Sequence, residues 1–584
     1  MSGQSQSSRA GKPRQYGYWR AASLMGVYLL FGLHIAHWKI TGRTLAPLEL
    51  NEVMYTLELG ILTAGFLFMI LAMVSVLIVG RFFCSWGCHI LALEDLSAWL
   101  LEKIGIRPKP VRLRSLLLVP PGAMVYMFVW PQISRLLDGR EMPALHITTD
   151  QAGWASFITQ DFWRNLPGPG VIVFTFFVVG FLIVYLLGSR SFCRYVCPYG
   201  ALFSLADRVA PGKIISLGDC SGCGICTAKC SSDIRVHEEL TVFGKVVSPS
   251  CLKDMDCVSS CPEGNIAFGF TKPSFFKSWK SHEKIKQPRY DFTLLEEGLL
   301  VLLFLGFFFS IRGLYGIFPF MLSMALGAIF AFGAIKAIRL VYADHVRLNQ
   351  FQLKINQRIR RAGWVFAAIV VVVGVLGMHS GYIRYHEFVG WRAVRALEQH
   401  PSDLDEPSDA SAMVELAYAH LMTTKKWGVY TPSALDEKIG ELRVARAQVQ
   451  AQGGDGAGAI AELESVIQDY PDLAIGHYNL GGLYAMAGQE VKAIEQYEAA
   501  LRLDPSDPET WNTLGYLLLK AGRMDHAEYS FLAAIERKAD YAHPYFHLAR
   551  LMAMQGRYSQ AEIYIKQAAE LDPANYGQFL TPSP

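Results

Sequence analysis

The stretch CSGCGICTAKC, residues 220–230, carries four cysteines in the spacing C-x2-C-x2-C-x3-C. Three thiolates at this spacing can bind one face of a cubane iron–sulfur cluster, and the fourth cysteine of such a run crosses to a second cluster. Gly222 and Gly224 allow the tight backbone bends that turn amide groups toward the sulfurs. Zinc fits less well, because four cysteines within eleven residues crowd its tetrahedron. The stretch therefore predicts an iron–sulfur site.

A second run, CLKDMDCVSSCP at residues 251–262, has the same spacing with one change, because Asp254 occupies the second ligand position. By the crossing rule, the first cluster takes Cys220, Cys223, Cys226 and Cys261, and the second takes Cys230, Cys251 and Cys257 with Asp254 in fourth place. We expect a [4Fe-4S] cluster in the first site, and in the second either a [4Fe-4S] cluster with an aspartate ligand or a [3Fe-4S] cluster. Oxygen holds iron less firmly than sulfur does, so the Asp254 corner is predicted to be labile.

The remaining four cysteines form two C-x3-C pairs, Cys84 with Cys88 in GRFFCSWGCHI and Cys193 with Cys197 in SFCRYVCPYG. On a helix, this spacing would put both members of a pair on one face. If the two preceding spans are neighbours, the four thiols meet at one membrane edge, where they can hold a further iron–sulfur cluster or perform thiol–disulfide exchange. Packing of helix against helix by small buried cysteines is the structural alternative.

Composition divides the chain of 584 residues, which is 52% apolar and only 18% charged, into an apolar first part and a soluble helical remainder. Seven stretches are long and apolar enough to span a bilayer, which takes about 20 residues per helix. They lie near residues 20–38, 56–80, 113–130, 170–188, 292–311, 315–335 and 363–383, and Pro120 and Pro121 interrupt the third. We interpret the first as an uncleaved anchor, because no small-x-small cleavage site follows it.

Lysine and arginine counts in alternating loops predict the orientation. Residues 1–20, 81–114 and 336–361 hold 17, whereas residues 39–54, 131–168 and 311–314 hold 6. We expect a multi-pass protein of the inner (cytoplasmic) membrane, with the N-terminus and the 189–291 loop in the cytoplasm and the C-terminal part outside. A net charge of +3 gives no reason to expect a nucleic-acid partner.

The C-terminal part repeats with a period of 34 residues, the length of a tetratricopeptide repeat. Glycines and alanines recur at this spacing at positions 454, 488, 522 and 556 and at 459, 493, 527 and 561. Such repeats form an α-solenoid that binds a protein partner. The acidic stretch PSDLDEPSDA, residues 401–410, is interpreted as part of a linker.

His34 and His37 lie near the outer end of the first span. Polar residues within a membrane are candidates for function, so this pair is a candidate contact for a quinone or a haem. The alternative is that each imidazole simply reaches interfacial water.

Two C-x3-C pairs followed by a two-cluster loop make the chain similar to the NosR/NapH/CcoG-type membrane polyferredoxins, over roughly residues 55–270. The matching segments are GRFFCSWGC (80–88), FCRYVCPYGAL (192–202) and the loop at 220–262. The resemblance implies electron movement between the quinone pool, cytoplasmic clusters and redox partners or maturation targets. His89, Ser231 and Asp254 depart from the family pattern, and neither a flavin-attachment domain nor an immunoglobulin-like tail is evident.

The expected fold is mostly α, a polytopic membrane protein with about seven spans, an inserted two-cluster ferredoxin (α+β) domain and a C-terminal solenoid. The expected parts are 1–210 (membrane), 211–275 (ferredoxin-like), 276–400 (membrane), 401–439 (linker) and 440–584 (repeats). We expect an electron-transfer component of an oxidoreductase, similar to a quinol dehydrogenase, whose repeats dock a redox partner. The alternatives are an assembly factor that reduces a metal or thiol for a partner enzyme, and a redox-sensing scaffold.

Overall fold

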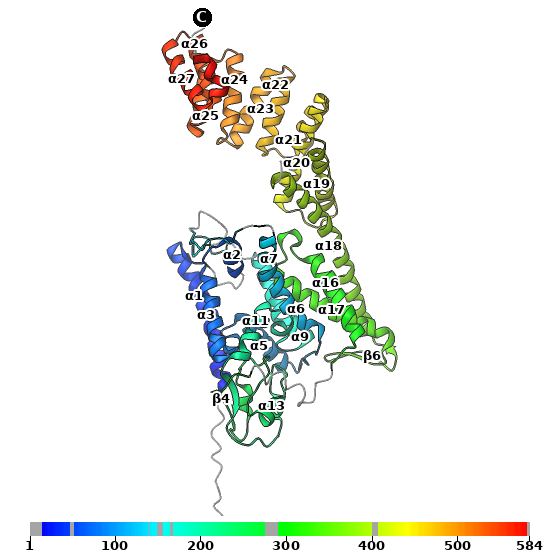
Figure 1. Ribbon diagram of the computed structural model, residues 1–584. Coiled ribbons are helices and arrows are strands. Elements are labelled where there is room, and N and C mark those ends of the chain that lie inside the picture. The colour runs from blue at the N-terminus through cyan, green and yellow to red at the C-terminus, as the bar shows by residue number, and fades with distance from the viewer. Residues whose placement is uncertain are drawn as a thin grey trace, which may run out of the picture. The chain divides into compact units, whose positions relative to one another are not determined.

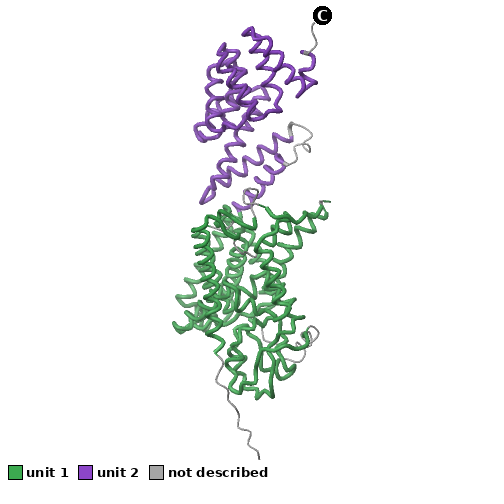
Figure 2. The backbone as a smooth tube through the Cα atoms, turned by 90° about the vertical axis from the view of Figure 1, so that its left-hand side faces the viewer, with its two compact units in different colours: residues 1–381 green, residues 382–584 purple. Residues whose placement is uncertain are grey.

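The computed structural model describes residues 15–46, 52–137, 139, 141–148, 156–163, 168–274, 290–399 and 407–580. The described residues are mostly helical (Figure 1). They form two compact units, Met1–Gly381 and Tyr382–Pro584, which Figure 2 distinguishes by colour. The mostly helical architecture predicted from the sequence is confirmed.

Six helices in the described residues are long and apolar enough to cross a membrane. They are α1 (Tyr16–Thr41), the composite helices Ser115–Leu137 and Pro169–Leu187, α16 (Leu294–Ile311), α17 (Phe320–Tyr342) and α18 (Arg361–Gln399). Within the composites the segments are η1 (Ser115–Leu118), α6 (Val119–Met124), η2 (Val125–Val129) and α7 (Trp130–Leu137), then α8 (Pro169–Phe176), η3 (Phe177–Leu182) and α9 (Ile183–Leu187).

The predicted span at 56–80 is not one long helix. It is divided between α2 (Glu52–Leu59) and α3 (Ala64–Val79), which has only 16 residues. Gly60 breaks the run with a φ of 76°, and a β-carbon there would lie 2.3 Å from the carbonyl oxygen of Ala144. Thr63 then caps α3 by accepting a hydrogen bond from the Phe66 amide. The described residues therefore hold six long apolar helices, whereas the sequence predicted seven spans.

Pro120 and Pro121 do not interrupt the third predicted span. Residues 115–137 are continuously helical, passing from a 3-10 turn through α6 and a π-helical segment into α7. Both prolines stand in the first turn of α6, directly after the 3-10 turn, in which the Leu116 carbonyl oxygen accepts from the Val119 amide and so needs no amide from residue 120. The sequence-based expectation of an interruption was wrong for this reason.

A small α+β fold follows the fourth span. Strand β3 (Gly212–Ser216) pairs antiparallel with β4 (Ile266–Phe270), with Gly212 opposite Phe270 and Ser216 opposite Ile266. Between the strands lie the helices α12 (Ile225–Ala228), α13 (Val236–Phe243) and α14 (Asp256–Ser260). Their core also contains cysteines of both runs, so the cluster loops are part of the packed interior.

Different loops lie at the two ends of the first unit. At one end the α+β fold contacts α1 through Arg20, which donates to the carbonyl oxygen of Asp254 at 3.2 Å. The sheet of β5 (Val346–Leu348), β6 (Phe351–Ile355) and β7 (Arg358–Ile359) lies toward the same end in Figure 1. At the other end β1 (Thr44–Leu45) pairs with β2 (Ile158–Thr159). The α+β fold and the sheet of β5 to β7, which were predicted to lie on one side of a membrane, lie toward one end of this unit (Figure 1).

Two helices connect α3 to the helix at Ser115–Leu137, and two connect α9 to β3 of the α+β fold. These are α4 (Phe82–Trp86), α5 (His89–Lys103), α10 (Ser191–Tyr195) and α11 (Pro198–Val209).

The segment predicted as a linker, 401–439, is largely helical. Residues 400–406 lie outside the described residues, but α19 (Pro407–Trp427) and the start of α20 (Ser433–Gln452) occupy the rest. Ala417 and Leu421 of α19 are completely buried in a core shared with Ile439 of α20. The linker prediction was based on the acidic, proline-containing start of this stretch. It did not take account of the apolar residues of α19, which pack against α20, and therefore extended too far.

The repeats form paired antiparallel helices. After α20 come α21 (Gly456–Asp469), α22 (Ala474–Met486), α23 (Glu490–Leu503), α24 (Pro508–Lys520), α25 (Met524–Arg537), α26 (Ala542–Met554), α27 (Tyr558–Leu571), α28 (Pro573–Tyr576) and η6 (Gly577–Leu580). The four periodic glycines all have φ between 73° and 91°, at the turn inside each pair. The periodic alanines at 459, 493 and 527 are completely buried, so the predicted solenoid of repeats is confirmed.

Candidate iron–sulfur and thiol sites

The two cysteine runs share one backbone conformation. Two residues after the first cysteine of each run, Gly222 has φ 74° and Lys253 has φ 56°. Two residues further on, Gly224 has φ 73° and Met255 has φ 64°. A left-handed conformation costs a non-glycine residue roughly 1–2 kcal/mol, so the second run keeps this shape at a cost. Asp254 consequently occupies the structural place that Cys223 has in the first run.

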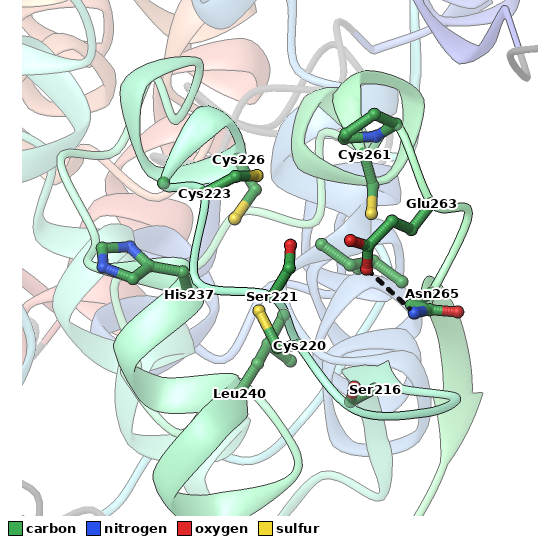
Figure 3. Close-up of a pocket in the computed structure, with 13 residues that line it drawn as sticks. Ser216, Cys220, Ser221, Cys223, Cys226, His237, Leu240, Cys261, Glu263 and Asn265 are labelled. Atoms are coloured by element: carbon green, nitrogen blue, oxygen red, sulfur yellow. Dashed lines mark hydrogen bonds between the residues drawn. The ribbon is translucent and has the colours of Figure 1, made fainter.

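The four cysteines predicted for the first cluster line one cavity. Their sulfurs face a common space in Figure 3. His237 and Glu263 also line it. The donors come from both runs, as the crossing rule predicts, because antiparallel pairing of β3 with β4 brings Cys261 back beside the first run. The donor set and the cavity fit a cubane cluster. The cysteines are Cys220, Cys223, Cys226 and Cys261.

The residues predicted for the second cluster are also brought together. Cys230, Cys251 and Cys257 belong to the core of the α+β fold. Asp254 is buried and lies close enough to all three thiols to act electrostatically on their ionisation. Three sulfurs and one carboxylate fit either of the cluster types expected from the sequence.

The Asp254 carboxylate has several partners in addition to its cysteine neighbours. Ser231 donates its hydroxyl to one carboxylate oxygen at 2.5 Å, and Arg190 donates to that hydroxyl at 3.1 Å. Guanidinium nitrogens of Arg190 and Arg20 lie 3.8 and 3.9 Å from the same oxygen. Ser231 and Asp254 are two of the positions that depart from the family pattern, and they contact each other.

No group of three or more His, Cys, Asp or Glu side chains among the described residues is arranged to hold a single metal ion. In a cubane cluster each cysteine binds a different iron. The sulfurs then surround a volume larger than one ion, whereas ligands of a mononuclear zinc site converge on one point.

The C-x3-C pairs are not on single helices. Cys84 lies in the short helix α4, which ends before Gly87, and Cys88 is the N-cap residue of α5. Cys193 lies in α10, and Cys197 is the N-cap residue of α11. The expectation of one helical face per pair was therefore wrong. Pro198 disfavours helical geometry at the residue before it, and Gly87 weakens the helix at the equivalent place.

In this geometry the second cysteine of each pair accepts hydrogen bonds from backbone amides at the start of a helix. Backbone amides at the start of α5 donate toward Cys88, and that of Gly200 donates toward Cys197. A helix N-terminus favours a thiolate. Gly200 is needed here, because a β-carbon on it would lie 2.7 Å from the Cys193 carbonyl oxygen.

All four of these thiols meet in one packed cluster with Tyr199 and Phe203. Burial raises the pKa of Cys88 to about 11 and that of Cys197 to about 12. Free thiols in this setting stay protonated at neutral pH, which disfavours thiol–disulfide exchange because the thiolate is the reacting species. The sequence left open whether the two C-x3-C pairs lie together, and the fold brings them together.

Glu94 is a member of this site that sequence reasoning missed. It is buried on α5, accepts a hydrogen bond from the Phe192 amide at 3.1 Å, and lies 3.5 Å from the Cys193 sulfur. No motif marks it, because its partners are about a hundred residues away in the chain.

A buried charge network joins the second cluster loop to the first C-x3-C pair. The Asp207 carboxylate contacts Lys253, lies 2.9 Å from Lys213 Nζ, and accepts from the Arg81 amide at 3.0 Å. Burial opposes its charge, but the two lysines hold the pKa of Asp207 below its usual value. Trp86, inside the C-x3-C motif, donates to the Lys253 carbonyl oxygen at 3.1 Å. These residues too were not found from the sequence.

His34 and His37 lie at the opposite end of the first unit. His34 Nε2 is 3.0 Å from the Leu45 carbonyl oxygen, and its ring packs edge-on against Phe162. His37 Nδ1 is 3.1 Å from the Thr44 hydroxyl. Both imidazoles tie α1 to the β1–β2 pair.

Known proteins resemble separate parts of the chain. A 4Fe-4S binding domain matches residues 61–107 and 170–216, and each match contains one C-x3-C pair. Tetratricopeptide repeats match residues 444–508, 496–528 and 542–575.

Two curated relatives are similar to the chain. A putative electron transport protein, YccM of Escherichia coli, is 26% identical over 287 residues, covering 45% of this chain and 70% of the relative. The methylamine utilization ferredoxin-type protein MauN of Methylobacillus flagellatus is 27% identical over 190 residues, covering 32% of this chain and 56% of that protein. Among solved structures, MamA covers 29% of this chain and 96% of its own, at 18% identity and a TM-score of 0.24. The membrane helices, the 4Fe-4S binding domains and the repeats fit a membrane polyferredoxin that carries C-terminal tetratricopeptide repeats.

Proposed function

We propose that the protein transfers single electrons between the cytoplasmic side of the inner membrane and a membrane or external redox partner. The observation that carries this proposal is the shared left-handed backbone of the two cysteine runs, which is retained at Lys253 and Met255 at a conformational cost. A run that had lost its cluster would have no reason to keep that shape. Iron–sulfur clusters, when bound, supply one-electron transfer.

The exposure of the cysteines supports an order in which electrons pass through the proposed sites. Cys223 of the first cluster site is exposed, so that site suits exchange with a soluble donor or acceptor. Cys251 of the second site is followed by Lys253, whose carbonyl oxygen accepts from Trp86 within the C-x3-C motif. The second cluster site and the thiol cluster therefore share a wall, which suits transfer between them.

We assign Cys84, Cys88, Cys193 and Cys197 to a third iron–sulfur site. Support comes from their convergence and from the two 4Fe-4S binding domain matches. Arg81 lies close enough to act on two of the thiols, so its positive charge would offset the negative charge of metal-bound thiolates.

A quinone is the proposed membrane partner, because it can carry electrons across the bilayer where the clusters, at one membrane edge, cannot. The loop at 189–291 is assigned to the cytoplasm from the lysine and arginine bias. The repeats are assigned to the outer side, where their concave surface would dock a redox protein. This places the protein as an electron-transfer component of a larger oxidoreductase.

The test is iron analysis and electron paramagnetic resonance of the full chain, purified without oxygen, before and after reduction by dithionite. We expect about twelve irons per chain if all three sites fill, and about eight if only the loop sites do. Reduction by a quinol analogue should produce the same signals as dithionite. Zinc in place of iron would refute the proposal.

A further inference from the structure

A second cleft in the first unit lies where the membrane helices meet the α+β fold, and it adjoins the proposed third iron–sulfur site through Arg81 and Cys193. Its volume is about 230 Å³, a little below the roughly 300–1,000 Å³ of sites for drug-sized ligands. Its walls come from α6, α10, α11 and the two loops that carry Ser232 and Ser250.

The polar side of this cleft offers hydrogen-bond donors. Three arginines line it, Arg81, Arg190 and Arg194, and among the described residues that line it there is no carboxylate. Arg190 is already paired with Asp95 at 2.8 Å, so Arg81 and Arg194 supply the available positive charge. A ligand for this side must therefore be an acceptor with negative charge.

Two buried donors at this cleft have neither a hydrogen bond nor an ion pair among the described residues. They are Nε of Arg81 and the hydroxyl of Ser232, and both side chains are more than nine-tenths buried. A buried donor without an acceptor costs free energy, so such atoms indicate a missing partner. Arg194 is held beside them, because its Nη2 donates to the Ser232 carbonyl oxygen at 2.5 Å.

The opposite wall is apolar and reaches the membrane surface of the unit. Pro120, Met124 and Leu252 line it, and Leu117 and Leu205 are about half exposed at its edge. The helix containing Leu117 is one of the apolar spans, so this edge lies where acyl chains would meet lipid headgroups. Basic pockets of this kind on one membrane face bind anionic lipid headgroups.

We propose that this cleft binds the phosphate group of an anionic phospholipid, with Arg81, Arg194 and Ser232 as donors and with the apolar wall along an acyl chain. Cys193 lines the same cleft, so a bound phosphate places negative charge beside the proposed third site. The inference stands apart from the proposed function, because it concerns ligand binding with no electron transfer.

The test uses the full chain in a neutral detergent and measures binding of phosphatidylglycerol, phosphatidylcholine with the same chains, and inorganic phosphate. We expect saturable binding of one phosphatidylglycerol per chain. Arg194→Gln should weaken it about fivefold, from about 1 kcal/mol for each basic residue at an anionic membrane surface. Ser232→Ala is a second variant, from which we expect a smaller loss of lipid affinity. The absorbance of the iron–sulfur clusters in the loop at 220–262 checks that both variants fold.

Arg107→Gln is the matched control, because Arg107 is a highly exposed arginine outside the cleft. Inorganic phosphate that binds as well as the lipid would identify a soluble phosphate as the source of the same group. Wild-type affinity in both Arg194→Gln and Ser232→Ala would overturn the proposal. An equal loss in Arg107→Gln would also overturn it, because the binding would then be non-specific surface attraction.

Discussion

Replacing Asp207 by asparagine tests whether the buried charge network holds the α+β fold on the membrane helices. Asp207 is completely buried on α11, and the lysines beside it are 1% exposed. Lys253 belongs to the second cluster loop and Lys213 to β3, so one carboxylate serves two segments of the fold. The amide of asparagine keeps the shape of the side chain but removes the charge.

The expected loss is large because two buried ammonium groups would be left without an anion. Removing one partner of a buried ion pair typically costs about 3–5 kcal/mol. Here a single change affects two pairs, so we expect about 5 kcal/mol, which corresponds to a fall in Tm of about 6 °C for a unit of 381 residues. Further carboxylates near Lys253 do not compensate, because Asp254 is held by Ser231 and arginines.

The assay is thermal unfolding of the full chain in detergent, followed by the loss of iron–sulfur absorbance and by circular dichroism. Glu102→Gln is the control, since it removes an exposed ion pair with Arg107 worth at most about 1 kcal/mol. Adding Lys253→Met to Asp207→Asn should recover part of the loss, because it removes one of the two unpaired charges. Unfolding of Asp207→Asn within 1 °C of the Glu102→Gln control, a margin set at about the error of such measurements, would refute the reasoning.

Three further predictions address the clusters and the repeats. Oxidation of the wild type should yield a [3Fe-4S] signal that Asp254→Cys abolishes, and a wild type that keeps full iron through oxidation contradicts the lability of that corner. Cys193→Ser should lower the iron content by about four per chain while the loop signals persist, and unchanged iron would remove the third site. In the repeats, burial, with smaller contributions from nearby Arg550 and His543, holds the pKa of His547 down to about 4. The unfolded chain therefore binds more protons between pH 6.5 and 4, so stability should fall by about 2–3 kcal/mol as pH drops through that window. His547→Leu should show a flatter profile in thermal unfolding at several pH values, and an equally steep one would contradict the assignment.

The cysteine sites could be predicted because their chemistry is local in sequence. The runs at 220–230 and 251–262 carry their own spacing, and β3–β4 pairing only has to bring the crossing ligand Cys261 into place. The repeats could also be predicted from the sequence, because their small residues recur at a fixed period and pack against the next helix.

What the sequence did not reveal depends on contacts between distant segments. Glu94 meets Cys193 across about a hundred residues, and Asp207 meets Lys253 across 46. A buried charge looks the same in sequence as an exposed one, and only the fold tells them apart. The helix break inside each C-x3-C pair was missed for a different reason. The spacing rule assumes one continuous helix, whereas Gly87 and Pro198 end the helical geometry inside each pair.

The departures from the family pattern gain a common physical explanation from these contacts. A cysteine at 254 would need no donor, whereas a buried carboxylate needs several, and the Ser231 hydroxyl supplies one. Arg190 supports both residues, and it adopts a left-handed conformation with φ 65°. It also lies close enough to influence Cys193 of the thiol cluster. A change at 254 therefore alters the charge balance around Arg190, and through it the electrostatic setting of both proposed metal sites. The aspartate is better regarded as one member of a charged link between the second cluster site and the membrane thiols than as a damaged ligand position.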